Sequence, residues 1–312
     1  MSSEIHRPVL CREVVTLLSK APAGTIVDGT VGLGGHAKAL LEASGDVQLL
    51  GIDRDEAALT LAEERLGRFG ERVRLVHGDY VDIVAHLAAF GAKRIEGLLL
   101  DVGISSLQLD DPQRGFSFRK DGPLDMRMDR SAGRPASTWI AEATEKELAE
   151  VLRHDGEERF ARRIARAIVR ARERAPIQRT SVLREIVHRA VPRSYFAQSI
   201  DPATRTFQAI RIAINRELES LRAGLDSGFG LLSTGGILVV ISFHSLEDRI
   251  VKLFFREKAA ACVCPPDLPD CICDKEIEAE ILTRRPITPT PEEIAENPRA
   301  RSAKLRAARK VI

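Results

Sequence analysis

Apolar runs and helical patterns alternate through the first hundred residues. The runs predict strands at residues 25–28, 47–52, 73–77 and 95–100. Between them, helical periodicity predicts helices near 36–43, 55–69 and 82–90. This alternation is typical of an α/β fold in which helices cover both faces of a parallel sheet. Right-handed crossovers then bring the residues that follow the strands to one edge of the sheet: Asp28, Asp53, 77–80 and Asp101.

The pattern changes after Asp101. Residues 110–200 carry no convincing strand, but Thr144–Glu147 and Asp155–Glu158 have the spacing of a capping box, which marks the start of a helix. After the second box, apolar residues repeat at helical spacing with arginines on the other faces: Phe160, Ile164, Ile168 and Ala171. We therefore expect a helical insertion over residues 112–200.

A long helix is predicted after this insertion. Asp201-Pro202 supplies an N-cap with proline in the first turn. The apolar stripe of the helix is formed by Phe207, Ile210, Ile214, Leu218 and Leu221. The sheet resumes at Gly236–Ile241, so the sheet domain is expected to be discontinuous, with residues 1–111 and 201–312.

The composition fits a soluble globular protein. The chain has 312 residues, of which 44% are hydrophobic and 29% charged, enough apolar material for a core in more than one ordinary domain. No apolar run approaches the roughly 20 residues that span a bilayer, and Met1–Leu10 has no apolar signal-peptide core. We expect a cytoplasmic protein without a membrane partner.

Basic residues are concentrated in two places, although the net charge is only +2. Residues 153–193 contain twelve arginines and five acids, and residues 299–310 contain six basic residues and no acid. Clusters of this kind suit a polyanionic partner such as nucleic acid. A solvated helix face gives the same pattern, because arginine is a good helix former.

A glycine-rich loop follows the first predicted strand. It reads Asp28-Gly29-Thr30-Val31-Gly32-Leu33-Gly34-Gly35-His36, and Asp53 ends the second strand. Glycines let the backbone approach a ligand, and the acid can accept hydrogen bonds from ribose hydroxyls. This pattern predicts a nucleotide site but does not choose among NAD, FAD and S-adenosylmethionine.

The segment after the fourth strand narrows this choice. It reads Asp101-Val102-Gly103-Ile104-Ser105-Ser106-Leu107-Gln108-Leu109-Asp110 and opens into a polar loop. In S-adenosylmethionine enzymes, residues at this point lie between the methyl donor and the acceptor, whereas a dehydrogenase more often continues with another short βα unit. A nicotinamide enzyme is therefore the weakest option.

Five segments together carry a resemblance to a known family. They are residues 101–110, Arg114–Phe118, Gly122–Met128, Asp201–Asn215 and Ile241–Arg249. The chain resembles the RsmH (MraW) family from residues 6–10 to the basic tail. That resemblance implies a class I methyltransferase fold (Rossmann-like) with an inserted helical domain, and S-adenosylmethionine as the donor. It also implies methyl transfer to the exocyclic N4 of one cytosine in the decoding region of 16S rRNA, with the small ribosomal subunit as partner.

The resemblance also implies cofactor contacts at seven positions of this chain. Gly34, Gly35 and His36 would meet the methionine end of the cofactor, and Asp53 the ribose. Tyr80 falls where the family has an aromatic residue beside the adenine, and Asp101 and Gln108 match the last two contacts. Each residue type also has a structural interpretation, such as a core aromatic for Tyr80 or a solvated loop residue for Gln108.

Asp101 is the candidate catalytic residue. Cytosine N4 is a poor nucleophile because its lone pair is delocalised into the ring, so an enzyme must orient it and accept its hydrogen bonds. Asp101 is the carboxylate at the required strand end. Many amino-methyltransferases have prolines and an aromatic after this acid, but this chain has Val102-Gly103-Ile104. The residue that stacks on the base must therefore come from elsewhere, with Phe116, Phe118 and Phe243 as candidates.

Two other clusters carry chemistry. Ser242, His244 and Glu247 contain the residue types of a nucleophilic triad, but three residues so close in sequence rarely reach triad geometry, and Ser245–Asp248 has capping-box spacing.

Four cysteines in two Cys-x-Cys pairs could bind a structural zinc ion, although zinc sites more often have a wider gap within each pair: Cys262, Cys264, Cys271 and Cys273. Catalysis in the family requires no metal. Cys11 is expected to be a small buried hydrophobe.

Alternatives to this function remain open at this point. One is N4 methylation of a cytosine in another nucleic acid, and another is a ribosome-assembly factor that binds rRNA without turnover. The sequence leaves both a monomer and a homodimer open.

Overall fold

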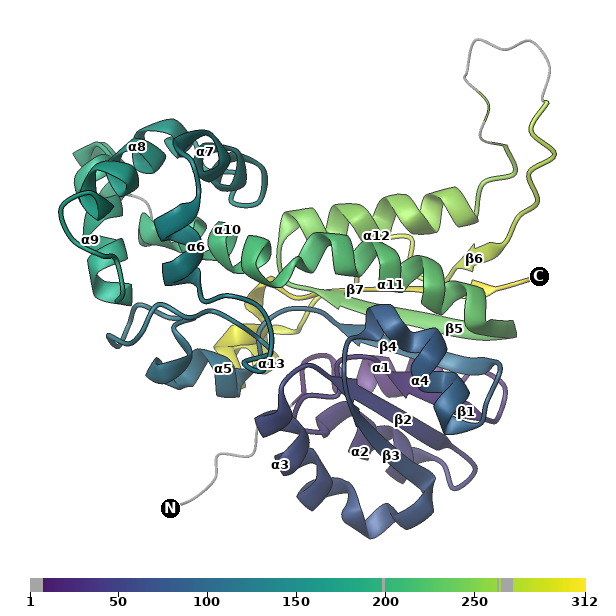
Figure 1. Cartoon of the computed structure of the whole chain (residues 1–312). Coiled ribbons are helices and arrows are strands. Elements are labelled where there is room, and N and C mark those ends of the chain that lie inside the picture. The colour runs from purple at the N-terminus through teal and green to yellow at the C-terminus, as the bar shows by residue number, and fades with distance from the viewer. Residues whose placement is uncertain (1–7, 198–199, 263, 265–271) are drawn as a thin grey trace. The chain divides into compact units, whose positions relative to one another are not determined.

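The computed structural model describes residues 8–197, 200–262, 264 and 272–312. It divides into two compact units, each described separately below. The sheet unit comprises Met1–Gly103 and Leu218–Ile312, and the helical unit comprises Ile104–Glu217 (Figure 1). No described helix combines the length and the apolar character required to cross a membrane.

The sheet unit is built on seven strands in the order β3-β2-β1-β4-β5-β7-β6. The first five pair in parallel, and β7 pairs antiparallel with both β5 and β6. The strands are β1 (Thr25–Asp28), β2 (Gln48–Asp53), β3 (Val73–His77), β4 (Ile95–Asp101), β5 (Leu232–Ser242), β6 (Ala279–Ile281) and β7 (Lys304–Lys310). The α/β class and the four predicted N-terminal strands are confirmed.

Helices cover both faces of this sheet. One face carries α1 (Cys11–Leu18), α2 (Gly35–Ala43) and α3 (Glu56–Leu66), and the other carries α4 (Ile83–Phe90), α11 (Glu217–Leu231) and α12 (Ser245–Lys258) (Figure 1). The short α13 (Pro291–Glu296) precedes β7. Helices α2, α3 and α4 match the predicted positions, whereas α1 was not predicted.

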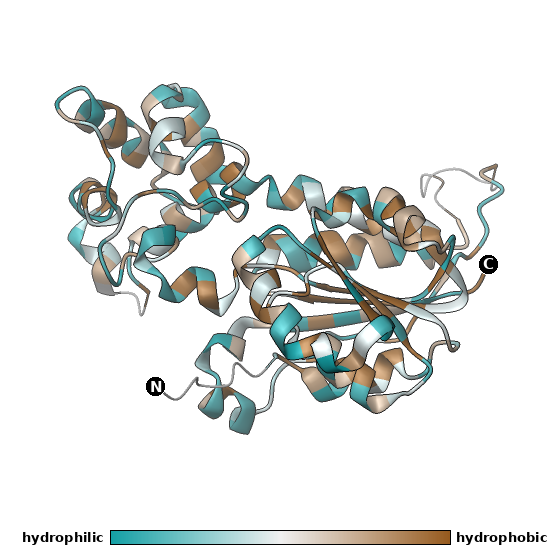
Figure 2. Cartoon of the chain, turned by 60° about the horizontal axis from the view of Figure 1, so that its bottom comes forward, coloured by the Kyte–Doolittle hydropathy of each residue, from teal (hydrophilic) through white to brown (hydrophobic). Residues whose placement is uncertain are grey.

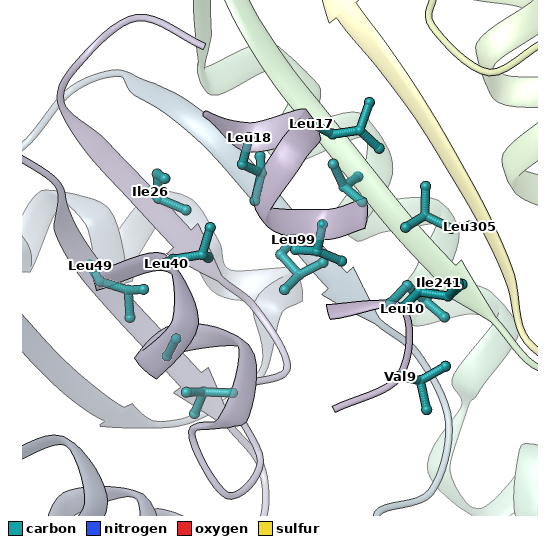
Figure 3. Packing of buried hydrophobic residues seen from close by; sticks show 14 of the residues in the cluster. Val9, Leu10, Leu17, Leu18, Ile26, Leu40, Leu49, Leu99, Ile241 and Leu305 are labelled. Atoms are coloured by element: carbon teal, nitrogen blue, oxygen red, sulfur yellow. The ribbon is translucent and has the colours of Figure 1, made fainter. Parts of the chain in front are cut away.

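Consecutive strand residues divide the core into two layers. Ile26, Leu49 and Leu99 lie in the cluster beneath α1 and α2 (Figure 3), and their chain neighbours Val27 and Leu50 lie in the opposite cluster. Each is at most 4% exposed. Parallel strands buried on both faces have continuous apolar sequences, and Figure 2 shows these strands as an apolar centre between more polar helices.

The C-terminal segment is a strand of the sheet and not a basic tail. Leu305, Ala307 and Ala308 are fully buried in β7. The guanidinium of Arg306 donates to Asp248 at 2.7 Å, and Arg309 pairs with Glu280 at 2.9 Å. Sheet pairing and ion pairs with acids therefore engage basic residues of β7, and the expectation that this segment holds RNA stays a prediction.

The helical unit has its own apolar core. Its helices are α5 (Ser106–Asp110), α6 (Ala136–Glu142), α7 (Glu145–His154), α8 (Ala161–Arg172), α9 (Thr180–Ala190) and α10 (Ala203–Asn215). Five 3₁₀ turns lie elsewhere in the chain or join these helices: Gly67–Arg72, Tyr80–Asp82, Pro112–Arg114, Arg193–Ala197 and Pro298–Ser302. Among the described residues of this unit there is no strand, only an isolated bridge between Pro123 and Arg179.

One of the two predicted capping boxes in this region is correct. Thr144 and Glu147 form a capping box at the start of α7. The prediction at Asp155–Glu158 is wrong, because α8 begins at Ala161. The buried carboxylate of Glu158 instead accepts hydrogen bonds from the backbone N–H of Phe160 at 2.7 Å and from the Tyr195 hydroxyl.

The predicted long helix is two helices. Arg216 adopts a left-handed conformation with φ of 50°, which ends α10 at Asn215 before α11 begins. The helical unit therefore extends to Glu217 and begins at Ile104, beyond the expected limits of 112 and 200. Helix α10 belongs to this unit because Phe207 and Ile210 are buried in its core.

Candidate cofactor site

The glycine-rich loop is fixed between the ends of three strands. The N–H of Gly29 donates to the carbonyl of Leu99 at 2.9 Å, and the N–H of Val31 donates to the carbonyl of Ile52 at 3.0 Å. A Cβ atom at Gly29 would lie 2.7 Å from a methyl carbon of Leu100. Gly34 has a φ of 75°, which favours glycine. The loop therefore has the close approach and the positive φ that require glycine.

Asp53 anchors this loop from the end of β2. One carboxylate oxygen accepts from the N–H of Gly32 at 2.7 Å, and the other accepts from the N–H of Asp55 at 2.9 Å. Burial raises the pKa of Asp53 to about 6, although these two backbone N–H groups act to lower it. A carboxylate offers about four acceptor positions, so the side chain retains capacity for two further donors such as ribose hydroxyls.

His36 begins α2 and lies next to two acids at strand ends. Its Nε2 is 3.5 Å from an Oδ atom of Asp101, and its side chain is 6% exposed. Burial alone would lower the pKa of His36, but contacts with Asp101 and Cys11 and the charges of Asp101 and Asp28 raise it to about 10. The two neighbouring acids therefore favour the imidazolium form of the ring.

Asp28 is the second acid beside His36. It ends β1, is 1% exposed, and accepts one backbone hydrogen bond from the N–H of Thr30 at 3.2 Å. Burial raises its pKa to about 7, while the positive charge of His36 acts to lower it. The sequence placed Asp28 at this edge of the sheet and at the start of the glycine-rich motif, but Asp28 was not among the seven proposed cofactor contacts.

Several buried polar atoms at this edge are unsatisfied. Among the described residues, no hydrogen-bond partner exists for Oδ2 of Asp28 or Oδ1 of Asp101. The hydroxyl of Thr30 accepts from the N–H of Asp101 at 2.7 Å, which fixes the backbone at the end of β4. Buried polar atoms normally have partners, so this edge is suited to a polar ligand.

Tyr80 lies in the core of the sheet unit. Its ring is 9% exposed, and a Cβ atom at Gly224 would lie 2.4 Å from it. The guanidinium of Arg54 is 5.7 Å from the ring centre, donates to Ser220 at 2.7 Å, and forms an ion pair with Asp79. Arg54 and Asp79 were not predicted, although each lies within one residue of a predicted contact.

Gln108 belongs to the helical unit. It is buried and forms a capping box with Ser105 at the start of α5, in which each residue accepts from the other's backbone N–H. The other six proposed contacts are all in the sheet unit: Gly34, Gly35, His36, Asp53, Tyr80 and Asp101.

The structure excludes a triad of Ser242, His244 and Glu247. The hydroxyl of Ser242 donates to the carbonyl of Lys304 at 3.4 Å and is not directed to the histidine. His244 and Glu247 form the capping box of α12, so the box expected at Ser245–Asp248 is one residue too late.

Three of the four cysteines in the Cys-x-Cys pairs lie close together in the structure. Cys262, Cys264 and Cys273 have sulfur atoms within 4.8 Å of one another, whereas Cys271 lies outside the described residues. Cys11 is partly exposed on α1 and contacts His36, so the expectation that it is buried is wrong.

Comparison with known proteins identifies the family. The family model described as the MraW methylase family matches residues 3–311. The chain belongs to this family.

Its relatives include two proteins named ribosomal RNA small subunit methyltransferase H. The protein from Geobacter sulfurreducens is 54% identical over 98% of this chain and 99% of its own length. The protein from Trichlorobacter lovleyi is 52% identical over 98% of both chains. The alignment with a solved structure titled as a putative rRNA methylase from Clostridium thermocellum covers 99% of this chain and 100% of that chain, with a TM-score of 0.45 and 12% identity.

The methyl donor of this MraW-family chain is S-adenosylmethionine, and the described residues fit it. A cofactor with a ribose and a charged amino acid end needs acceptors, a close backbone and an apolar side for the base. Acceptors come from Asp53 and from the unsatisfied atoms of Asp28 and Asp101, and the glycine-rich loop provides the close backbone, all at one edge of the sheet. When bound, the cofactor supplies the electrophilic methyl group.

We predict that Asp53→Ala weakens cofactor binding by about 10- to 100-fold, because the ribose loses a charged acceptor that contributes roughly 1.5–3 kcal/mol. Isothermal titration calorimetry with S-adenosylmethionine measures the dissociation constant of each variant. Asp46→Ala removes the same charge from an exposed loop before β2 and should leave affinity unchanged. Equal affinities of the two variants would contradict a ribose contact by Asp53.

A second prediction concerns pH. The folded pKa of His36, about 10, exceeds its ordinary value of 6.5. Its stabilising contribution is therefore complete below about 6.5 and is lost as the pH rises towards 10. We expect the free energy of unfolding to fall over pH 7–10 in the wild type and to fall less in His36→Gln.

Denaturant titrations across this range provide the measurement. The raised pKa of Asp28 also makes the free energy of unfolding fall with pH, but only between about pH 4 and pH 7. The change above pH 7 therefore reports on His36 and not on Asp28. His154→Gln, at the exposed end of α7, should behave as the wild type does. Parallel curves for all three proteins would show that His36 is not charged in the folded state.

Proposed function

We propose that this chain transfers a methyl group from S-adenosylmethionine to the exocyclic N4 of a specific cytidine in the decoding region of 16S rRNA. The proposed substrate is the small ribosomal subunit in the cytoplasm. Support for the rRNA substrate comes from relatives about half identical over nearly the full chain, which are named for small-subunit rRNA methylation. The observation that supports this chemistry is the unsatisfied carboxylate oxygen of Asp101.

Asp101 has the geometry of an acceptor for an amino group. Its Oδ2 faces the imidazolium of His36, whereas its buried Oδ1 has no partner among the described residues. A hydrogen bond from the N4 amino group to Oδ1 would orient the nitrogen and increase its electron density as the N–C bond forms. His36 would act as a positioning residue that holds the carboxylate.

The target base must be unstacked to reach such a site. Of the three candidate aromatics, Phe118 packs edge-on against Phe207 with ring centres 4.8 Å apart, and Phe116 is buried in the same helical core. Phe243 is only partly buried, and a Cβ atom at Gly103 would lie 3.2 Å from its ring. Phe243 follows β5 beside Asp101 and is the aromatic we propose for stacking on the cytosine.

The arginines of α8 form the proposed RNA surface in the helical unit. Ala161, Ile164, Ala165 and Ile168 face the core, which leaves the arginines of the other faces exposed: Arg162, Arg163, Arg166 and Arg170. Arg166 has a partner, Glu145, at 3.4 Å. Other arginines of residues 153–193 stabilise the helical unit itself. Arg172 donates to the carbonyl of Ala143, and Arg184 forms an ion pair with Asp201.

We predict that Asp101→Asn lowers the rate of methyl transfer by about 100-fold or more, the usual scale for a positioned acid–base group. The assay uses labelled S-adenosylmethionine, small subunits from cells that lack this protein, and nucleoside mass spectrometry of digested rRNA. N4-methylcytidine at one site with the wild type would support the function. Normal cofactor affinity with full turnover in Asp101→Asn would contradict the role of Asp101.

The same assay distinguishes the alternatives. Tight cofactor binding without transfer to subunits or naked rRNA would favour a non-catalytic assembly factor. Transfer to a different nucleic acid, with none to small subunits, would overturn the proposed substrate.

A further prediction concerns the exposed face of α8. Arg163→Ala/Arg170→Ala should weaken binding to small subunits about 10-fold and reduce the slope of log affinity against log salt by about 0.7–0.9 for each phosphate that is no longer neutralised. Filter binding across salt concentrations measures both quantities. Lys252→Ala/Arg256→Ala removes the same charge from exposed positions of α12. Equal losses of affinity in the two double variants would show that only overall charge matters.

A further inference from the structure

The connection between α12 and β6 contains the cysteine cluster. It runs over residues 259–278, and its base is closed where the N–H of Glu278 donates to the carbonyl of Lys258 at 2.8 Å and their side chains pair at 2.9 Å. Its described apolar side chains are exposed, with Ile272 at 74% and Ile277 at 49%. A connection of 20 residues between two elements is long for a compact domain, and long connections are usually functional. Apolar burial does not account for the close approach of its cysteines.

The sulfur atoms have the spacing of metal ligands. The Sγ atoms of Cys262 and Cys273 are 3.8 Å apart, and all three described sulfurs lie within 4.8 Å of one another. Tetrahedral zinc with bonds of about 2.3 Å places its thiolate sulfurs about 3.8 Å apart. In a disulfide, by contrast, the two sulfur atoms are bonded at about 2.05 Å. The backbone N–H of Cys264 also donates to the Sγ of Cys262 at 3.4 Å, the kind of contact that supports a thiolate ligand.

We propose that Cys262, Cys264 and Cys273 bind a zinc ion as thiolates. Each thiol that ligates the ion releases its proton to solvent on binding. The proposal depends on these three described residues; Cys271 supplies a further thiol in the sequence but lies outside the described residues. An all-sulfur ligand set selects zinc or an iron–sulfur cluster over hard cations such as Mg²⁺.

The position of the cluster indicates a structural role. Helix α12 begins after the carboxyl end of β5, where Asp101 pairs with Ile241, and ends near the loop. Its 14 residues span about 21 Å. Strand β6 then pairs Ala279 with Lys310 at the end of β7. The zinc would therefore lie away from the cofactor site and would close a long loop between α12 and an edge strand.

The test measures metal content in the full-length protein. Protein produced in zinc-supplemented cells and purified without chelator should contain about one zinc per chain by mass spectrometry of the elements. The triple variant Cys262→Ser/Cys264→Ser/Cys273→Ser should contain almost none, whereas Cys11→Ala should retain the wild-type content. Circular dichroism shows whether each variant is folded.

A titration of metal-free protein with Co²⁺ provides a second readout. The strong visible absorption of tetrahedral Co²⁺–thiolate should appear in the wild type and Cys11→Ala, be displaced by Zn²⁺, and be absent from the triple variant. Substoichiometric zinc without Co²⁺ uptake, equal zinc in the triple variant, bound iron, or a disulfide detected by intact mass would each overturn the proposal. None of these readouts depends on methyl transfer, so failure here is distinguishable from failure of the proposed function.

Discussion

The site depends on a charged cluster that the fold removes from water. His36 lies beside Asp101 and Asp28 with 6% of its side chain exposed, and burial of any one of these charges alone would be costly. The cluster exists because two parallel strands and the start of α2 deliver opposite charges to the same place. Two apolar layers exclude water from both faces of the sheet. Changes to the packing of β1 or β4 would therefore affect the electrostatics of the site as well as stability.

The sequence predicted the parallel part of the fold well because every local preference agrees there. β1 and β4 each contain a short apolar run that ends at an acid, Ile26–Val27 before Asp28 and Leu98–Leu100 before Asp101, and such runs are typical of strands buried on both faces. Strand β7 was not recognised because Lys304, Arg306 and Arg309 suggested a basic tail suited to a polyanionic partner. The acids that pair with them, Asp248 and Glu280, lie on other elements and are not evident from local sequence. The break at Arg216 was missed because a non-glycine residue adopts positive φ there.

The sequence offered candidate site residues where function imposes a local motif, and their contacts with the cofactor stay predictions. The glycines and Asp53 belong to such a motif, and the structure shows why: the carboxylate of Asp53 holds the N–H of Gly32. The surroundings of Asp28 and Arg54 could not be predicted from the sequence, because they depend on tertiary neighbours. Burial gives Asp28 its raised pKa, and Arg54 meets Ser220 across 166 residues of sequence. The relation of Gln108 to the cofactor, which the family resemblance implies, stays a prediction.

The carboxyl ends of β1 and β4 and the connection after α12 differ in what stabilises them. At the carboxyl edge, unsatisfied buried atoms of Asp28 and Asp101 reduce stability until a polar ligand pairs with them, so the apolar layers must stabilise an incomplete site. At the far end of α12, exposed Ile272 and Ile277 contribute little burial to hold a long loop. Thiolate ligation stabilises without a core, because one ion replaces many apolar contacts and restricts the unfolded loop. Such ligation would stabilise the connection between α12 and β6 without involving the groups at the carboxyl ends of β1 and β4.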